Sequence, residues 1–350
     1  MLIHEKLGLW YEKEKRDLPW RNTSDPYKIW ISEIILQQTR VAQGTDYYLR
    51  FLKKFPDIFS LALSETDEVL KIWQGLGYYS RARNLHETAR FIAFERNGQF
   101  PGSYDDLIKL KGIGEYSAAA ISSIAYNEPR AAVDGNVKRV ISRLFAVADD
   151  INSSNGKKII NSLAFDILDH NNPGRHNQAV IELGSSICLP KKPLCPDCPL
   201  NAVCQALKEK KLAEYPVKYN LTKVRNRFFI YLIIKYKDYI RLQKRTGGDI
   251  WEGLYEFPLL ETSGIPELKD FPVLISQFLK TTGNIIHINK ISEPITHKLS
   301  HQNIICHFLH ISVSGDLDTE SLPGKEVKII AFSEYPVPKL IERYASMTDF

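Results

Sequence analysis

The sequence has few cysteines, no long hydrophobic run and no large excess of charge of either sign. No apolar run approaches the length of a membrane span. The N-terminal stretch MLIHEKLGLWYEKEKRDLPW is charged throughout and lacks the apolar core of a signal peptide. We therefore expect a cytoplasmic protein that has no membrane partner.

What is present is typical of a folded, globular chain. Hydrophobic residues make up 44% and charged residues 25% of the sequence, which are ordinary values. The 350 residues are enough for two domains of roughly 150 residues each. The net charge of +5 permits nucleic-acid binding but does not argue for it alone.

Four of the five cysteines lie close together in the sequence, and the fifth is Cys306. An odd number of cysteines, clustered in an intracellular chain, indicates a metal site rather than a disulfide framework. The clustered cysteines are separated by six, two and five residues: Cys188, Cys195, Cys198 and Cys204. Four cysteines would also suit structural zinc, although zinc sites usually pair two short elements.

Residues 107–140 have the pattern of a helix, a tight turn, a second helix, a second turn and a third helix. Gly112 and Gly114 flank the first turn, where glycine can adopt left-handed backbone angles. The Ala- and Ser-rich residues that follow predict a helix over 115–125. A helix N-terminus offers free N–H groups to an anion. Because Lys111 lies beside it, we expect that anion to be a nucleic-acid phosphate.

The second turn, VDGN, precedes residues whose apolar members recur at helical spacing: Val137, Val140, Ile141 and Leu144. Asp134 therefore lies at or just before the start of this helix. Taken alone, this position predicts an N-cap. The alternative is a carboxylate held beside a DNA strand that the preceding hairpin binds.

An earlier helix carries an acidic residue among apolar neighbours. Asp25 followed by Pro26 predicts the helix start, and we expect the helix over residues 27 to about 43. Glu33 shares a helix face with Ile29 and Trp30. Burial there would raise the pKa of Glu33 and let it hold a proton near neutral pH. The alternative is a partly exposed glutamate at the edge of a core helix.

Another glycine turn carries aromatic side chains. Within EVLKIWQGLGYYSRARNL, Gly75 and Gly77 form the turn, and Leu76, Tyr78 and Tyr79 are expected to project from it. Such side chains can wedge between bases and unstack them, and two arginines follow closely. The same side chains could instead fill a core between helices.

The chain changes character after the cysteines. Residues 208–227 contain seven Lys or Arg against two Glu, which predicts a linker that follows DNA or a solvated basic tether. Residues 228–235 and 239–243 form strand-like runs separated by Lys237 and Asp238, a hairpin pattern. Four later histidines alternate along strand-like residues, a pattern that is more often structural than metal-binding: His297, His301, His307 and His310.

Four motifs together resemble the helix-hairpin-helix DNA glycosylases, and within them the adenine glycosylases of the MutY type. They are WISEIILQQTR, GLGYYSRARNL, the hairpin followed by VDGNVKRV, and the cysteine spacing, which resembles the [4Fe–4S] loop of that family. Farther on, RTGGDIWEGLYEFPLLE resembles the start of a Nudix-type domain, but the paired carboxylates of its catalytic box are absent. The domain is therefore expected to recognise a lesion rather than to hydrolyse a nucleotide.

The resemblance implies roles for individual residues. Glu33 would be the general acid and Asp134 would stabilise the sugar cation, with Tyr116 and Asn136 positioning Asp134 and the sugar. Two residues would contact the flipped adenine: Arg21 and Glu182. A further set would contact DNA: Gln38, Thr39, Leu76, Tyr78, Lys111, Gly112, Gly114, Ser300 and His301. Leu299 stands where the family has the phenylalanine of a Phe-Ser-His loop.

The resemblance also implies the organisation of the whole chain. We expect a mostly α helix-hairpin-helix glycosylase domain over 1–206, with the iron–sulfur loop at 188–204. A basic linker over 207–227 would lead to an α/β Nudix-like lesion-recognition domain over 228–350. The cofactor would be a [4Fe–4S] cluster held by the four clustered cysteines. The partner would be double-stranded DNA with adenine opposite 8-oxoguanine or guanine, bound by a monomer associated with the nucleoid.

Other functions are weighed against this one. A bifunctional lyase acting on oxidised pyrimidines would need a lysine whose amine attacks the sugar, and Tyr116 stands at that position. A catalytically silent damage-binding protein would carry the same motifs without turnover. A nucleotide hydrolase would need the Nudix box that the sequence lacks.

Overall fold

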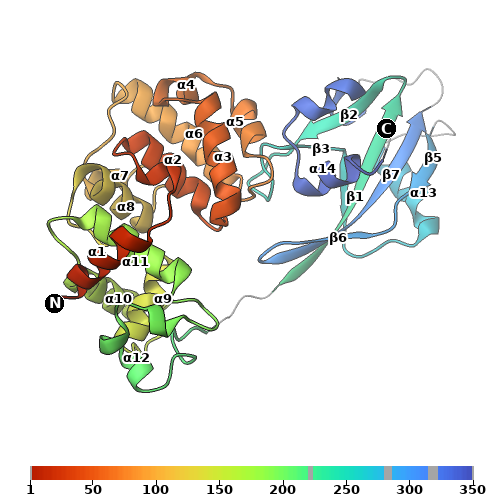
Figure 1. The fold of residues 1–350 in the computed structure, drawn as a ribbon. Helices are drawn as coiled ribbons and strands as arrows, with labels where there is room; N and C mark the ends of the chain where they lie inside the picture. The colour runs from red at the N-terminus through yellow and green to blue at the C-terminus, as the bar shows by residue number, and fades with distance from the viewer. Residues whose placement is uncertain (1, 220–223, 280–285, 314–321, 349–350) are drawn as a thin grey trace. The chain divides into compact units, whose positions relative to one another are not determined.

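The structure, a computed structural model, describes residues 2–219, 224–279, 286–313 and 322–348. The chain divides into two compact units: Met1–Leu63 with Asn84–Asn220, and Ser64–Arg83 with Leu221–Phe350 (Figure 1). A segment from the helical half of the sequence therefore groups with the C-terminal residues. Residues 220–223 of the expected linker lie outside the described residues.

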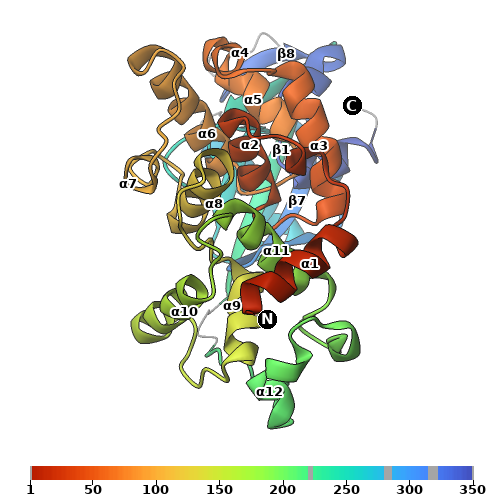
Figure 2. The ribbon, with the colours of Figure 1, turned by 60° about the vertical axis from the view of Figure 1, so that its left-hand side comes forward.

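The first unit is helical. Its helices, with α6 continuing from the second unit, are α1 (Ile3–Glu14), α2 (Pro26–Leu36), α3 (Val41–Lys54), α4 (Ile58–Leu63), α6 (Ser80–Arg90), α7 (Tyr104–Leu107), α8 (Glu115–Tyr126), α9 (Gly135–Leu144), α10 (Ser154–Asp166), α11 (Pro173–Ser186) and α12 (Gln205–Lys208). Helix α11 packs against α1, α8 and α9 (Figure 2). The predicted apolar stripe of α9 is buried in this core, together with Leu7 and Leu183.

Helix α2 is buried on nearly all sides, because its residues are apolar around most of its circumference. The Asp25 carboxylate accepts a hydrogen bond from the Tyr27 N–H at 2.9 Å, so the predicted cap is confirmed. The helix ends at Leu36, whereas the sequence predicted its end near residue 43. Gln38 has a φ of 58°, which a right-handed helix does not accommodate, and α3 begins only at Val41.

The hairpin turn confirms one of the two expected left-handed glycines. Gly112 has a φ of 79°, and a Cβ there would lie 2.7 Å from the Asn84 Cβ. Gly114 has a φ of −93° and caps α8, so its backbone does not require glycine. The predicted helix after the turn is confirmed, while the helix before it is short and ends at Leu107.

The described residues of the second unit include α5 (Thr66–Trp73), two helices described below and one mixed sheet. The strands are β1 (Arg225–Tyr236), β2 (Tyr239–Lys244), β3 (Tyr255–Glu256), β4 (Leu259–Thr262), β5 (Ile286–Ile291), β6 (Ile295–Lys298), β7 (Gln302–Val313) and β8 (Lys325–Lys328). The strand order is β3-β2-β1-β7-β5, with β4 beside β1, β6 beside β7 and β8 beside β2. Strands β1 and β7 are parallel, and β1 and β2 form the predicted hairpin.

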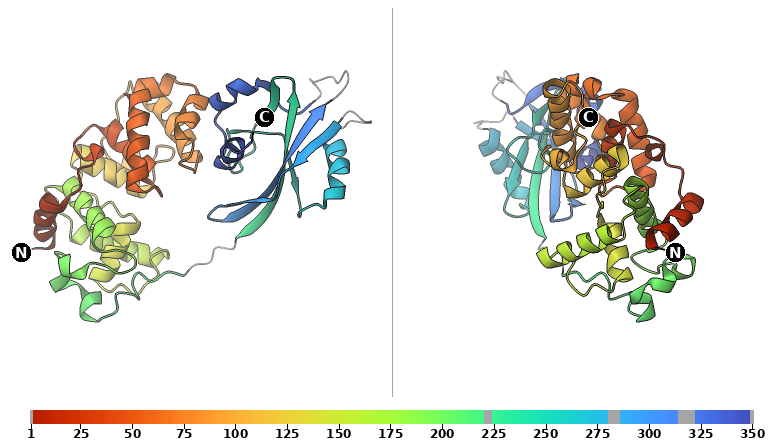
Figure 3. Two further views of the ribbon diagram at one scale, coloured as in Figure 1. Left: turned by 45° about the vertical axis from the view of Figure 1, so that its right-hand side comes forward. Right: turned by 90° about the vertical axis from the view of Figure 1, so that its left-hand side faces the viewer.

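Helices α13 (Phe271–Leu279) and α14 (Lys339–Ala345) cover opposite faces of the sheet (Figure 3). Phe271 of α13 packs with Leu232 of β1. Tyr344 of α14 stacks on Phe308, which stacks on Tyr231 of β1. Neighbouring residues of a strand point to opposite faces, so the two helices lie on different sides. This architecture confirms the predicted fold class.

None of the helices in the described residues has the length and apolar character needed to cross a bilayer.

Candidate active site

One cavity in the first unit collects side chains from separate parts of the chain. Its volume is about 910 Å³, and its walls come from α2, the turn after α2, the hairpin turn, α8, the start of α9 and α11. The predicted site residues that line it are Arg21, Glu33, Gln38, Thr39, Gly112, Gly114, Tyr116, Asp134 and Asn136. The two acidic residues expected to act together therefore share one cavity, although about a hundred positions separate them in the sequence.

Glu33 lies in the wall of this cavity and is 8% exposed. Burial raises the pKa of its carboxyl to about 7. A hydrogen bond from the Tyr116 hydroxyl lowers this pKa, and the nearby charge of Asp134 raises it. A carboxyl that titrates near neutral pH can hold a proton and release it to a bound group. Of the two interpretations of Glu33, the buried carboxyl is therefore confirmed and the partly exposed one is not.

Asp134 is both a helix cap and a residue of the cavity wall. Its carboxylate accepts hydrogen bonds from the backbone N–H groups of Asn136 at 2.8 Å and Val137 at 2.7 Å. Burial raises the pKa of Asp134, and these bonds to its charged form oppose that rise. The two interpretations of Asp134 are therefore compatible, because the N-cap holds the carboxylate in place beside the cavity.

Asn136 connects Asp134 to an arginine that the sequence analysis did not single out. The Asn136 side-chain amide donates to Asp134 at 2.8 Å, and its oxygen accepts from Arg139 at 2.9 Å. Arg139 also donates to the carbonyls of Gly184 and Cys188 at 2.7 Å each. The only sequence signal for Arg139 is its position one turn into the helix that Asp134 caps.

A buried ion-pair cluster lies at one side of the cavity. Glu182 is 1% exposed and accepts two hydrogen bonds from Arg16, at 2.6 and 2.7 Å, and one from Arg21 at 2.5 Å. Burial alone would raise the pKa of Glu182, but the bonds from the two arginines outweigh it and lower the pKa. Arg16 and Arg21 line the cavity. Arg16 was missed, although it lies five residues before Arg21 in a basic stretch.

Two further predicted residues occupy the turn after α2. Gln38 and Thr39 both line the cavity. The left-handed φ of Gln38 is unusual for a residue with a side chain, and such strain is often found at functional sites. Lys111, in contrast, does not line the cavity, and its ammonium pairs with the Glu87 carboxylate at 2.5 Å on the exposed surface.

The second glycine turn, residues 75–78, belongs to the second unit. Gly75, Gly77 and Tyr78 all have positive φ, of 97°, 75° and 48°. The Tyr78 side chain projects and is 48% exposed, whereas Leu76 is half-buried. The prediction that Tyr79 also projects is wrong. Tyr79 is buried, and its hydroxyl accepts a hydrogen bond from the Gly75 N–H because the turn folds back over it.

Within the same unit, the predicted lesion-contacting residues lie near this turn. Ser300 and His301 connect β6 to β7, and the Ser300 hydroxyl lies 3.2 Å from the His301 Nδ1 atom. The Tyr78 hydroxyl donates to the Ser300 hydroxyl at 3.4 Å. A hydrogen bond therefore joins these two segments, which lie more than two hundred residues apart in the sequence.

The four clustered cysteines line a single small cavity beside α9. Within the described residues, no three His, Cys, Asp or Glu side chains converge closely enough to hold a metal ion. The donor set nonetheless fits an iron–sulfur cluster, because the cavity is lined by four thiols and by no histidine or carboxylate. Buried Arg143 supports the loop by donating to the carbonyls of Leu189 and Pro190, at 2.7 and 3.0 Å.

Two family models match the chain. The model described as "HhH-GPD superfamily base excision DNA repair protein" matches residues 31–164, and that of the NUDIX domain matches residues 229–347. The adenine DNA glycosylase of Buchnera aphidicola subsp. Baizongia pistaciae (strain Bp) is 37% identical over 304 residues, covering 86% of this chain and 83% of the relative. The chain belongs to the adenine DNA glycosylases.

Other similarities agree with this family. The adenine DNA glycosylase of Homo sapiens is 42% identical over 206 residues, which cover 56% of this chain and 38% of the human protein. A solved thermostable thymine-DNA glycosylase, 28% identical, matches with a TM-score of 0.55 over 59% of this chain and 95% of its own. An endonuclease III in a non-covalent DNA complex, 23% identical, shares the fold with a TM-score of 0.50, covering 60% of this chain and 99% of its own. As an adenine DNA glycosylase family member, the chain is an enzyme of base excision repair.

Proposed function

We propose that this adenine DNA glycosylase excises adenine paired with 8-oxoguanine or guanine in double-stranded DNA. One observation carries the proposal: a carboxyl that titrates near pH 7 and a capped, hydrogen-bonded carboxylate line the same cavity. Two carboxyl groups with different protonation states are the arrangement that glycosidic bond cleavage uses. The names of the related glycosylases supply adenine as the base.

In the proposed reaction, Glu33 donates its proton to N7 of the adenine. The bond between the sugar C1′ and the base N9 then breaks, and its electron pair leaves with the neutral base. The sugar becomes an oxocarbenium-like cation, which the negative charge of Asp134 stabilises. Water adds to C1′ and gives up a proton, so the products are free adenine and an abasic site. Tyr116 and Asn136 hold the two carboxyl groups through the hydrogen bonds described above.

Access to the cavity requires the adenine nucleotide to leave the base stack. Tyr78 and Leu76 are proposed to enter the duplex, since an exposed aromatic ring on a strained turn can replace a displaced base. The backbone N–H groups at Gly112 and Gly114 would bind a phosphate, with Lys111 beside them. Gln38 and Thr39 would contact the partner base, and Ser300 and His301 the oxidised guanine. These assignments come from the family resemblance, and the exposure of Gln38, Tyr78 and the Ser300 loop supports them.

The ion-pair cluster would hold the extruded base. Arg21 lines the cavity and can present N–H groups to the ring nitrogens of adenine. Glu182 fixes the Arg21 guanidinium and offsets one of the two positive charges of Arg16 and Arg21, which keeps one donor group at a defined place. We therefore assign adenine recognition to Arg21, with Glu182 beside it.

Two chemical features complete the proposal. Tyr116 has no amine, so the enzyme should release the base without cutting the strand. A [4Fe–4S] cluster would be held by Cys188, Cys195, Cys198 and Cys204. It would cross-link parts of the loop, and the proposed reaction needs no redox step. Arg143 and Arg139 tie the same loop to α9, next to Asp134.

A single-turnover assay tests the proposal. A duplex with adenine opposite 8-oxoguanine is mixed with excess enzyme and divided into samples quenched with and without alkali. We expect free adenine, with a strand break only after alkali. A break without alkali would support the lyase alternative, and tight binding without release of adenine would support a silent binder.

A further inference from the structure

The turn that carries Tyr78 is fastened to the C-terminal part of the second unit. Lys244 pairs with Asp67 of α5 at 2.6 Å. Gln74, directly before the turn, donates to Glu342 at 2.9 Å. These contacts lie along the segment that leads into residues 75–78, so the C-terminal residues support the turn from one side.

A second support comes from residues 245–254. Arg83, which follows the turn, pairs with the Glu252 carboxylate at 2.8 Å and also donates to the Glu252 carbonyl. The side chains of Arg83 and Glu252 are 26% and 36% exposed, so the pair is partly shielded. Gly253 has a φ of 84°, and a Cβ there would lie 3.1 Å from Leu70 of α5. The backbone of these residues therefore lies directly against α5.

The same residues also reach β6, the strand that leads into the loop carrying Ser300. The Trp251 ring packs edge-on against His297 of β6, with 5.7 Å between ring centroids. Trp251 has a φ of 61°, a strained conformation that the surrounding structure must hold in place. Residues 245–254 thus contact both segments whose hydroxyls meet at Tyr78 and Ser300.

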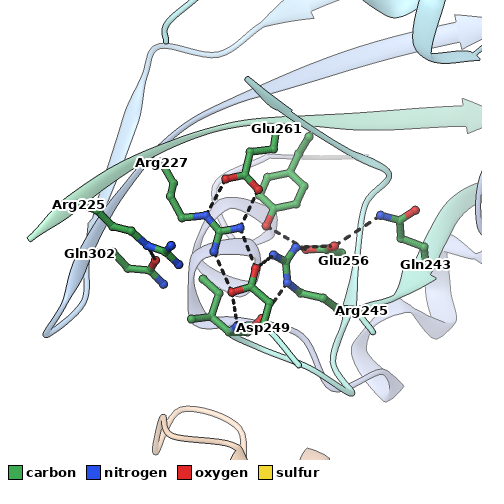
Figure 4. A network of polar contacts seen from close by, with 10 residues as sticks. Arg225, Arg227, Gln243, Arg245, Asp249, Glu256, Glu261 and Gln302 are labelled. Carbon is green, nitrogen blue, oxygen red and sulfur yellow. Dashed lines mark hydrogen bonds and ion pairs between the residues drawn. The ribbon is translucent and has the colours of Figure 1, made fainter. Parts of the chain in front are cut away.

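A network of ion pairs fixes residues 245–254 to the sheet (Figure 4). Arg227 of β1 binds both oxygens of Asp249, at 2.9 and 2.7 Å, and both oxygens of Glu261. Arg245 binds Asp249 at 2.6 Å and buried Glu256 at 3.0 Å. Paired arginines and carboxylates in a bidentate arrangement set direction as well as distance. The network is therefore a rigid base for Trp251 and Glu252.

We propose that residues 245–254 are a positioning element for lesion recognition, and that the Arg83–Glu252 pair is its contact with the Tyr78 turn. This proposal rests on the function proposed above. 8-Oxoguanine differs from guanine by one carbonyl oxygen and one N–H, so discrimination depends on a few well-placed polar contacts. The Tyr78–Ser300 contact is long, at 3.4 Å, so a small shift of either segment alters it. Breaking the Arg83–Glu252 ion pair should therefore reduce the preference for 8-oxoguanine over guanine more than it reduces the rate of adenine excision.

The test uses the full chain and two duplexes, with adenine opposite 8-oxoguanine or opposite guanine. Single-turnover rates at limiting and saturating enzyme are measured for the native chain, Glu252→Gln and the exchange Arg83→Glu with Glu252→Arg. Glu267→Gln is the matched control, because Glu267 is an exposed carboxylate whose ion-pair partner is exposed Lys269, at 2.6 Å, and not an arginine of the Tyr78 turn. Thermal unfolding confirms that each variant is folded.

We expect the preference for 8-oxoguanine over guanine to fall about fivefold in Glu252→Gln, as loss of one contact in a coupled set would give. The change should appear at limiting enzyme, and the control should keep the native preference. The exchanged pair restores the ion pair but not the hydrogen bond from Arg83 to the Glu252 carbonyl, so it should recover part of the preference. An equal loss on both duplexes, or an unchanged preference in a folded Glu252→Gln, would overturn the positioning role. If the native chain releases no adenine from either duplex, the proposed function itself fails.

Discussion

Replacing Glu33 by glutamine should change how the stability of the fold depends on pH. The pKa of Glu33 rises from 4.5 to about 7 because the folded chain buries it. A group whose pKa is raised by folding stabilises the fold below its unfolded value, and this contribution is lost as the pH rises through the folded value. The stabilising contribution of Glu33 is therefore lost as the pH rises from 4.5 to 7. Each pH unit corresponds to about 1.4 kcal/mol, which gives roughly 3 kcal/mol in all.

Glutamine has the shape of the protonated carboxyl and can still accept the hydrogen bond from Tyr116, but it does not titrate. The free energy of unfolding of the native chain should therefore fall by roughly 3 kcal/mol more than that of Glu33→Gln between pH 4.5 and 8.5. The assay is denaturant unfolding followed by the far-ultraviolet helix signal, which comes mainly from the first unit. Parallel pH dependence of the two proteins would refute the buried, proton-holding carboxyl.

Three further predictions concern the cavity and the cysteine loop. Tyr116→Phe removes the hydrogen bond that lowers the pKa of Glu33, so the alkaline fall in the excision rate should move to higher pH in a pH–rate profile. Asp134→Asn keeps one oxygen to cap α9 but loses the charge and the acceptor for the Asn136 amide, so the single-turnover rate should drop about 10² to 10³-fold while thermal unfolding still shows a folded protein. Cys198→Ser should lower the iron content of the purified protein and increase proteolysis within residues 188–204, and native values of both would argue against a cluster there.

Local patterns predicted those parts of the fold that depend on nearby residues. The cap at Asp25, the helix after Gly114 and the apolar stripe of α9 each follow from spacing within one or two turns. The strand-like runs of β1 and β2 and the Lys237–Asp238 turn between them act at the same short range. For Glu33 the neighbouring residues left a buried and a partly exposed carboxyl open, the family resemblance favoured the buried one, and the structure confirms that one.

Features that depend on distant partners were not predicted. Tyr79 is buried because the turn folds over it, and nothing in the adjacent residues distinguishes it from exposed Tyr78. Arg16 pairs with Glu182, 166 positions away, and Arg139 bonds to two carbonyls that lie 45 and 49 positions away besides nearby Asn136, so no spacing rule indicates their roles. The break after α2 depends on a left-handed Gln38, a conformation that the sequence gives no reason to expect at that residue.

The central claim is that neutral Glu33 donates the proton that releases adenine. Single-turnover release of adenine from the duplex containing 8-oxoguanine, measured from pH 5.5 to 9, tests it most directly. Because the pKa of Glu33 is about 7, the rate should fall about tenfold for each pH unit well above that value, and Glu33→Gln should release no adenine. A rate that stays level to pH 9, or a Glu33→Gln enzyme with near-native activity, would contradict the account.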